Sequence, residues 1–313
     1  MRLLIPLLLT FSILRPAQAD VPRVVTDIAP VHGLVERVMA GLGAPEVILP
    51  PGASPHSYAM RPSEARALSG ADLVFWVGPA LTPWLAGPIE TLAPDAQHIA
   101  FMELESVALL PFREGAMFEA HDDHDHGEHA HDTHDAHDGP VDPHVWLDPH
   151  NARVFMAEVA RQLGAADPEN AEHYAENARA GGAEIEALET RITAELSTVS
   201  GRPFLVLHDA YHYFEAHFGF EAMGAISLAD GGGASAARLS ELHDKVSEMG
   251  VSCVLTEPNA QRGLIDAVAA QGDITVQEVD PLGVALPRGP DFYPALLSEI
   301  ATGLGICLGD KSS

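Results

Sequence analysis

Short apolar runs alternate with amphipathic stretches in the first part of the chain. Four runs have the length and composition of buried strands: residues 24–25, 47–49, 73–77 and 99–101. Apolar positions recur with helical spacing from 31 to 40. A second helix is expected to begin near Arg61, with Pro62 in its first turn, and a third to contain Trp84.

The same alternation returns in the last third of the chain. The predicted strands are 204–207, 225–228, 251–255 and 274–279. The predicted helices are 211–218, 235–249, 263–270 and 293–304. Serial strand–helix units predict an α/β fold with two lobes and mostly parallel sheets. Ligand sites of such sheets lie beyond the carboxyl ends of the strands.

A helical region separates the two alternating parts. One helix is expected from 149 to 163, and a second begins with Asp167 as its cap and Pro168 in its first turn. This second helix runs to about residue 196 and is rich in Ala, Glu and Arg, which predicts a long, largely exposed connection between the lobes. The predicted organisation is a leader (1–19), a first lobe (20–165), a linker helix (166–200) and a second lobe (201–313).

The N-terminus has the pattern of a signal peptide. Arg2 is followed by a short apolar run, and Ala17-Gln18-Ala19 has the small residues of a cleavage site. The run is too short to span a bilayer, and no nearby cysteine could carry a lipid. A buried N-terminal helix is the alternative, which Pro16 disfavours. We therefore expect cleavage near Ala19 and a periplasmic protein.

The chain is strongly acidic, with a formal net charge of −28 at pH 7. Losing Arg2 and Arg15 with the leader would remove two positive charges and make it −30. Such a protein repels nucleic acid and anionic lipid, so neither is an expected partner. An acidic surface suits cations, although most of these carboxylates serve only to keep the protein soluble.

Two cysteines, Cys253 and Cys307, are present. An even number in an exported protein suggests a disulfide, with two free buried thiols as the alternative. In the chain-entropy account, a loop of this size would stabilise the fold by up to about 4 kcal/mol.

Residues 119–138 interleave histidines with Asp and Glu and contain nothing that could build a core, so this insert is predicted to be disordered. Its histidines are His121, His124, His126, His129, His131, His134 and His137. Imidazole binds zinc, copper and nickel. Ordering a loop costs about 1–2 kcal/mol per residue, however, which points to an auxiliary, low-affinity metal loop.

A tight metal site requires ligands on rigid elements. His56, His208 and Asp280 each follow or end a predicted strand, and His144 lies just after the insert. Any one of them alone would more often be an ordinary hydrogen-bonded residue. Together, three imidazoles and a carboxylate form the tetrahedral set that zinc accepts.

The other histidines are interpreted as outer neighbours, surface residues or packing residues. His212 lies one turn past His208 and is expected beside the site rather than on the metal. The rest are His32, His98, His150, His173, His217 and His243. The large aromatic residues Trp76, Trp84, Phe101 and Trp146 fit apolar core runs.

These segments resemble the zinc-binding subunit of bacterial ABC importers, the ZnuA-type proteins of the cluster A-I metal-binding family. The matching motifs follow one another over nearly the whole chain: residues 51–63, 142–149, 208–211, 256–258 and 280–283. The resemblance implies two lobes bridged by a rigid helix, with the metal between them. It implies ligands His56 and His144 from the first lobe and His208 and Asp280 from the second.

The resemblance also implies the function: high-affinity capture of Zn²⁺ in the periplasm and delivery to the permease of an ABC transporter. A periplasmic zinc metallochaperone is a further partner to consider, and a monomer is expected. In manganese-binding relatives a glutamate stands at the position of His208, and imidazole favours zinc over manganese. A histidine-rich loop is likewise a zinc-type trait, and the cysteine pair matches a disulfide of some members.

One position departs from the pattern of some zinc-binding members, in which an acidic residue precedes the first ligand. Here that position is Pro55, so the fourth ligand is expected to be Asp280, with water as the alternative. A manganese or iron carrier of the same fold and a zinc buffer without an importer remain alternatives. A periplasmic zinc hydrolase is also considered. No His-Glu-x-x-His motif is present, and Asp280 would fill the position that a substrate needs, so we expect no enzyme.

Overall fold

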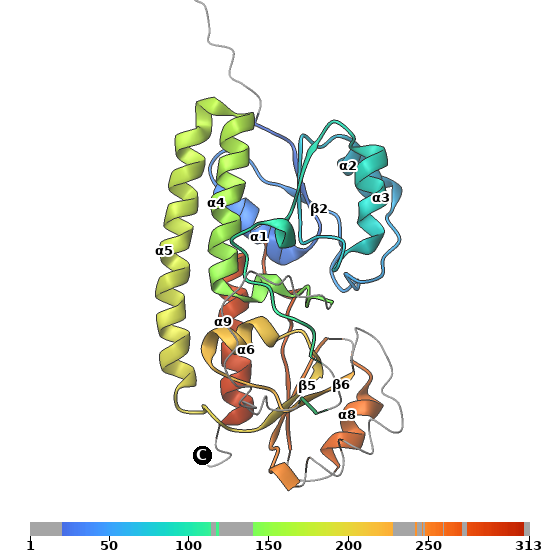
Figure 1. Cartoon of the computed structure of the whole chain (residues 1–313), viewed down its shortest axis with the longest axis vertical. Helices are drawn as coiled ribbons and strands as arrows, with labels where there is room; N and C mark the ends of the chain where they lie inside the picture. Colours follow the sequence, from blue (N-terminus) through green and yellow to red (C-terminus); the bar gives the residue numbers. More distant parts are fainter. Residues whose placement is uncertain are drawn as a thin grey trace, which may run out of the picture.

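In the computed structural model, two lobes with four-stranded parallel sheets lie beside a pair of long helices (Figure 1). The structure describes residues 21–113, 117–118, 140–227, 242, 246, 248–258, 260–270 and 274–309. The predicted leader, the histidine-rich insert and most of the helix predicted at 235–249 lie outside the described residues. Within the described ranges, no helix has both the length and the apolar composition that a membrane span requires.

The first sheet has the strand order β2-β1-β3-β4. Its strands are β1 (Val24–Thr26), β2 (Glu46–Val47), β3 (Leu73–Trp76) and β4 (Gln97–Ala100). Its helices are α1 (Ala29–Met39), α2 (Pro62–Ser69) and α3 (Pro83–Leu92). Because successive strand residues point to opposite faces, Phe75 joins the core cluster of α1, whereas Val74 and Trp76 join that of α2 and α3. The predicted elements are confirmed, although β2 and β4 each begin before their predicted runs.

The second sheet repeats this arrangement with the order β6-β5-β7-β8. Its strands are β5 (Phe204–His208), β6 (Gly224–Ser227), β7 (Cys253–Thr256) and β8 (Thr275–Glu278). Its helices include α6 (His212–Phe218), α8 (Arg262–Ala269) and α9 (Phe292–Leu308). Cys253 of β7 and Cys307 of α9 form a disulfide with a Cα–Cα distance of 5.3 Å, which confirms the predicted pairing and fixes α9 to the sheet.

Helices α4 (Pro149–Ala166) and α5 (Ala171–Leu196) form the antiparallel pair beside the lobes. The helix predicted from Asp167 begins instead with a 3-10 turn, η3 (Pro168–Asn170). Asp167 ends α4, where its N–H still donates to the Leu163 carbonyl at 2.8 Å. Pro168 has no N–H with which to extend that ladder, and the chain therefore reverses there.

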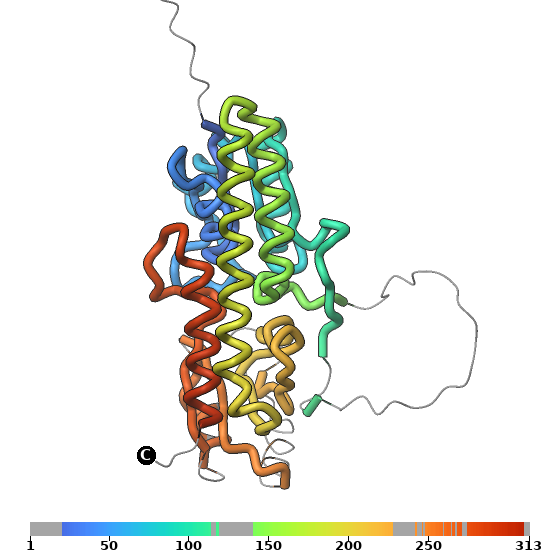
Figure 2. The backbone as a smooth tube through the Cα atoms, turned by 90° about the vertical axis from the view of Figure 1, so that its left-hand side faces the viewer, coloured from blue at the N-terminus to red at the C-terminus, as the bar shows by residue number. Residues whose placement is uncertain are grey.

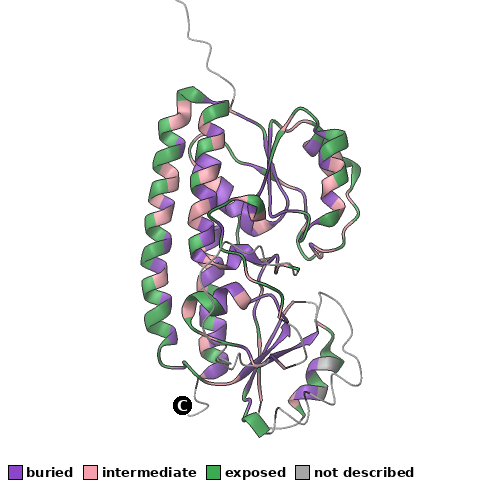
Figure 3. Ribbon diagram, in the orientation of Figure 1, coloured by how far each residue is buried: buried purple, intermediate pink, exposed green. Residues whose placement is uncertain are grey.

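The long helix α5 is exposed on its outward side and buried along one stripe (Figure 3). A Cβ atom on Gly181 in this stripe would lie 3.1 Å from both Met156 Sδ and Arg37 Cγ. Glycine therefore permits α5 to approach α4 and α1 closely. Helix α9 of the second lobe also contacts α5 and α1, so both lobes are held by the same helices (Figure 2).

Buried Asp27 ties the ends of β1 and β3 together. Its carboxylate accepts hydrogen bonds from the N–H groups of Ile28 at 2.8 Å and Val77 at 2.9 Å. Burial raises the pKa of Asp27 from 3.8 to about 6, although the N–H donors act in the opposite direction. The site therefore favours a protonated carboxyl group more than an unfolded chain does.

We predict that Asp27 makes the free energy of unfolding depend on pH. Its folded pKa of about 6 lies above the unfolded value, so the folded state holds the proton more tightly. This stabilising contribution is complete below the unfolded pKa and is lost as the pH rises through the folded pKa, by about 3 kcal/mol. Denaturant titrations of the wild type and Asp27→Asn on both sides of this window will measure the difference.

The surface residue Asp72 provides a control, because its pKa is shifted in the opposite direction to that of Asp27. Its hydrogen bond from Arg23 holds the pKa of Asp72 below its ordinary value, so its contribution is lost as the pH falls. An unchanged pH dependence in Asp27→Asn would contradict the assignment.

Candidate metal centre

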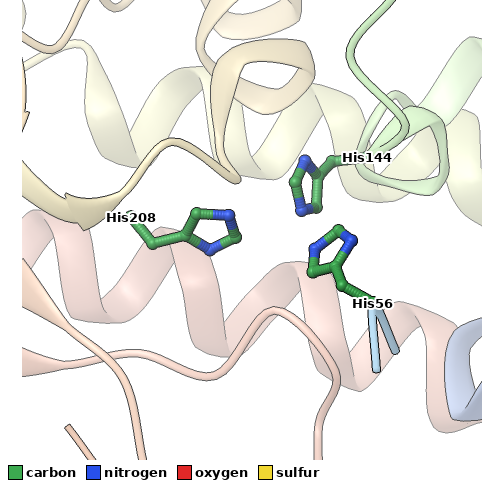
Figure 4. A group of neighbouring side chains, drawn as sticks. All are labelled: His56, His144 and His208. Atoms are coloured by element: carbon green, nitrogen blue, oxygen red, sulfur yellow. The ribbon is translucent and has the colours of Figure 1, made fainter. Parts of the chain in front are cut away.

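Three histidines from three separate segments converge between the lobes (Figure 4). His56 lies in the loop after β2, His144 directly precedes the 3-10 turn η2 (Val145–Leu147), and His208 is the last residue of β5. One nitrogen of each ring lies within 4.8 Å of the others, and the ring centroids are 5.0, 5.7 and 6.0 Å apart. In the described part of the chain, this is the one group of His, Cys, Asp or Glu side chains placed to share an ion.

The three rings differ in their burial. His144 is 3% exposed and His208 is 5% exposed, whereas His56 is half-buried. An ion held by the three rings would therefore be shielded from water mainly on the side of His144 and His208. The half-buried His56 marks the more open side.

Carboxylates lie against the outer nitrogen of two rings. Asp142 Oδ1 is 2.6 Å from Nδ1 of His144 and also accepts the backbone N–H of His144 at 2.9 Å. Glu257 Oε1 is 3.3 Å from Nδ1 of His208. A carboxylate at Nδ1 keeps the proton there, leaves the Nε2 lone pair for a metal and strengthens it as a donor. The His144 imidazole is thus prepared to bind through Nε2, and at His208 the Glu257 carboxylate is a nearby negative charge.

The loop that carries His56 is braced by aromatic side chains. The indole N–H of Trp84 on α3 donates to the carbonyl of Pro55 at 2.7 Å. Tyr58 packs edge-on against Trp84, with ring centroids 5.3 Å apart, and donates to the Glu64 carboxylate on α2 at 2.9 Å. Trp84 was expected in the core, but it is only half-buried, and its N–H fixes the residue beside His56.

Asp280, the fourth predicted ligand, does not belong to the group of three histidines. It follows β8 in the second lobe, and both of its oxygens accept backbone N–H groups. Oδ1 accepts from Leu282 at 2.9 Å and Oδ2 from Val284 at 2.5 Å. These bonds close a tight turn and fix the direction of the carboxylate. A carboxylate oxygen that accepts one hydrogen bond retains a second lone pair that can bind a metal.

The residues on both sides of Asp280 are anchored to the other ligand segments. The indole N–H of Trp146, two residues after His144, donates to the Pro281 carbonyl at 3.0 Å. The hydroxyl of Tyr211, three residues after His208, donates to the Val279 carbonyl at 3.0 Å. The turn is therefore positioned by the segments that carry two of the histidines.

His212 occupies the outer position that was expected for it. Its Nδ1 lies 3.8 Å from Asp142 Oδ2, on the far side of the carboxylate that contacts His144. Burial lowers the pKa of His212, with Arg113 acting in the same direction. The neutral form is therefore favoured.

Sequence reasoning found the three converging histidines but not the groups that support them. Asp142 and Glu257 were noted within motifs, without roles. An acidic residue two positions before a candidate ligand was the available signal for Asp142. No local signal marks Glu257, because it meets His208 only through the pairing of β5 with β7.

Three neutral imidazoles suit a borderline-soft dication. Zinc binds histidine nitrogen at about 2.0–2.1 Å, which places tetrahedral ligands about 3.4 Å apart. The nitrogens lie within 4.8 Å of one another, so small side-chain rotations would bring them to that spacing. Calcium and magnesium prefer oxygen and do not match this donor set.

Comparisons with known proteins agree with this chemistry. The chain matches the family described as "Zinc-uptake complex component A periplasmic" over residues 24–304. It is 41% identical over 304 residues to the high-affinity zinc uptake system protein ZnuA of Brucella abortus, with 91% of each chain covered. It is 42% identical over 306 residues to the protein of that name from Paracoccus denitrificans, with 94% of each chain covered.

A solved structure described as "Crystal structure of ZnuA" has a similar fold. The TM-score is 0.75 at 22% identity, and the alignment covers 93% of this chain and 100% of that one. At this identity the likeness supports the two-lobed fold alone.

We predict that Trp84→Phe weakens metal binding at the three histidines by about fivefold. Phenylalanine keeps the contact with Tyr58 but cannot donate to Pro55, and one hydrogen bond contributes about 1 kcal/mol. Competition titration of Zn²⁺ against a chelating dye will measure the change.

Trp76→Phe is the matched control. Among the residues that the structure describes, the Trp76 indole nitrogen has no hydrogen-bond partner, so this substitution removes packing but none of the described bonds. It should lower the melting temperature and leave Zn²⁺ affinity unchanged. Equal affinities for Trp84→Phe and the wild type would show that the brace does not position His56.

Proposed function

This chain belongs to the ZnuA family of periplasmic zinc-uptake components, and we propose that it captures Zn²⁺ between its lobes for delivery to the membrane permease of an ABC importer. The observation that carries the proposal is the convergence of His56, His144 and His208. Each lobe supplies at least one of these rings, so a bound ion would bridge the lobes. A permease could therefore distinguish the loaded protein from the empty one by the relative position of the two lobes.

The donor set supports zinc as the cargo. Three imidazoles are softer than the carboxylate-rich sets that suit manganese, and His208 stands where manganese carriers of the family were expected to have glutamate. The carboxylates of Asp142 and Glu257 contact the rings rather than the centre of the group. They strengthen the nitrogen donors without changing the set toward oxygen.

Capture without turnover is part of the proposal. A hydrolytic zinc site needs an open coordination position and a group that activates water. In our proposal the fourth position is filled by Asp280 from the second lobe, with water as the alternative. A filled fourth position suits transport and not catalysis.

The leader would be cleaved near Ala19 and the mature chain would act as a monomer in the periplasm. The Cys253–Cys307 disulfide is consistent with that oxidising compartment. The insert at 119–138 would act as an auxiliary, weakly binding loop. A zinc metallochaperone remains a candidate second partner.

We predict that His208→Ala abolishes tight Zn²⁺ binding. Removal of one of the three histidine ligands should cost more than the roughly 10–100-fold that follows loss of an outer partner. Competition titration with a high-affinity chelator will resolve this site from the weaker sites of the insert. The control is His98→Ala, which removes an exposed imidazole of β4. Undiminished tight binding in His208→Ala would overturn the proposal, and tighter binding of Mn²⁺ than of Zn²⁺ by the wild type would favour the manganese carrier.

We predict that Asp280→Ala lowers Zn²⁺ affinity about as much as His208→Ala does, because both remove a ligand. The exposed carboxylate of Asp291 lies in the same lobe, and Asp291→Ala therefore controls for the loss of one negative charge. X-ray absorption of the zinc-loaded protein will count the ligands directly. A loss of only a few fold, with the coordination number unchanged, would identify water as the fourth ligand.

A further inference from the structure

The histidine-rich insert leaves the first lobe through two arms, which we call the stem: residues 109–113 with 117–118, and residues 140–142. The arms pair through an antiparallel bridge between Pro111 and Val141. The N–H of Asp142 donates to the Leu110 carbonyl at 2.9 Å. Although the stem follows the first sheet in sequence, the trace descends from that lobe toward β6 (Figure 1).

The end of the outgoing arm is attached to the second lobe. Met117 forms an antiparallel bridge with Gly224 of β6, the edge strand of the second sheet. The N–H of Phe118 donates to the Met223 carbonyl at 2.9 Å. The outgoing arm therefore begins in one lobe and ends against the sheet of the other.

Arg113 anchors this arm through two buried carboxylates. Its guanidinium donates to both oxygens of Asp209, with Nε to Oδ2 at 3.1 Å, and Nη1 donates to Glu215 Oε2 at 2.7 Å. The side chains of Arg113, Asp209 and Glu215 are only 12%, 5% and 2% exposed. The guanidinium also lies 4.0 Å from the ring centroid of Phe118. Desolvation acts to lower the pKa of Arg113, but Glu215 and Asp209 together outweigh it and raise that pKa.

The same carboxylates shape the segment that carries His208. Asp209 is the residue directly after this histidine, and Glu215 lies on α6, the next helix. Glu215 also accepts the N–H of Ala222 at 2.8 Å, which ties α6 to the approach of β6. Arg113 therefore joins the stem, the carboxyl end of β5 and α6 in one buried cluster.

The stem reaches a second histidine as well. Tyr213 of α6 accepts the N–H of Leu110 at 2.9 Å and donates to the carbonyl of Asp142 at 2.8 Å. Asp142 is the carboxylate that contacts Nδ1 of His144. Movement of the stem would consequently disturb the supports of two of the three rings.

We propose that Arg113 is a positioning residue for zinc capture. Its guanidinium holds His208 in place through its hydrogen bonds to Asp209 and Glu215. The inference deepens the proposed function and rests on it. One guanidinium bonded to two carboxylates allows both anions to stay buried beside the site. Without it the two carboxylates would repel each other or move toward water, and the end of β5 would move with them.

The test compares Arg113→Met and Arg113→Lys with the wild type in the full chain. Zn²⁺ affinity and release rate are measured by chelator competition far below each melting temperature. The visible spectrum of the Co²⁺-loaded protein reports the coordination geometry. Arg153→Met is the control, because Arg153 pairs with Glu189 between α4 and α5, their side chains are 25% and 19% exposed, and neither helix carries one of the three histidines.

We expect Arg113→Met to bind Zn²⁺ about 10–100-fold more weakly, with faster release and an altered Co²⁺ spectrum. Arg113→Lys should be intermediate, because lysine keeps the charge but not the planar fork that bonds two carboxylates. Arg153→Met should lower the melting temperature while leaving affinity and spectrum unchanged.

Wild-type affinity, release rate and spectrum in Arg113→Met would overturn the inference, whatever its melting temperature. Arg113→Met leaves the carboxylates of Asp209 and Glu215 buried without a cation. If this variant does not fold, the triple variant R113M/D209N/E215Q removes those two charges as well, and its Zn²⁺ affinity then tests the inference. Wild-type affinity there would also overturn the inference. Failure of the proposed function is distinguishable, because the wild type and His208→Ala would then bind Zn²⁺ alike.

Discussion

The nitrogens of three histidines lie within 4.8 Å of one another, although the residues come from distant parts of the chain. This closeness constrains the whole arrangement. His56 lies in the loop after a strand of the first sheet and His208 ends a strand of the second, so the carboxyl ends of the two sheets must face each other. Parallel sheets place their loops at that end. The strand ends and loops between the lobes therefore carry the donor groups, while the remaining strand positions can be apolar.

The helices keep the two sheet ends at this separation. Helix α5 runs beside both lobes and α4 beside the first, and α9 contacts α1 of the first lobe as well as the strands of its own (Figure 2). Tyr293 of α9 donates to the Trp146 carbonyl at 2.6 Å, which links this helix to the segment of His144. Close approach at Gly181 and the disulfide at Cys307 lock the helices to their neighbours. A site built from both lobes consequently has a rigid frame behind it.

Most of the strands and the three converging histidines could be predicted from the sequence, because the patterns that indicate them are local. Apolar runs of strand length predicted the strands. Two histidines at or after strand ends and one just after the insert predicted the three side chains that converge. The 3-10 turn before α5 was missed, because Pro168 fits the first turn of a helix as well as a reversal. The contacts of Arg113 were missed for a different reason. Asp209 and Glu215 are 96 and 102 residues away, and nothing near Arg113 in the sequence indicates them. Asp280 was identified by its motif, but the two N–H groups that it accepts depend on the path of its turn.

Four carboxylates lie around the three imidazoles without being part of the group of three histidines. Asp142 and Glu257 contact the rings, and Asp209 and Glu215 lie behind them against a single guanidinium. Carboxylates bound directly to the ion would favour hard cations such as manganese. Carboxylates behind imidazoles still attract a dication, because the field of a buried charge is poorly screened. They leave ring nitrogen as the donor atom at three of the four proposed positions, with Asp280 as the single proposed carboxylate ligand. Selectivity for zinc and attraction for its charge can thus be adjusted separately, the first by the ring nitrogens and the second by the buried acids around them.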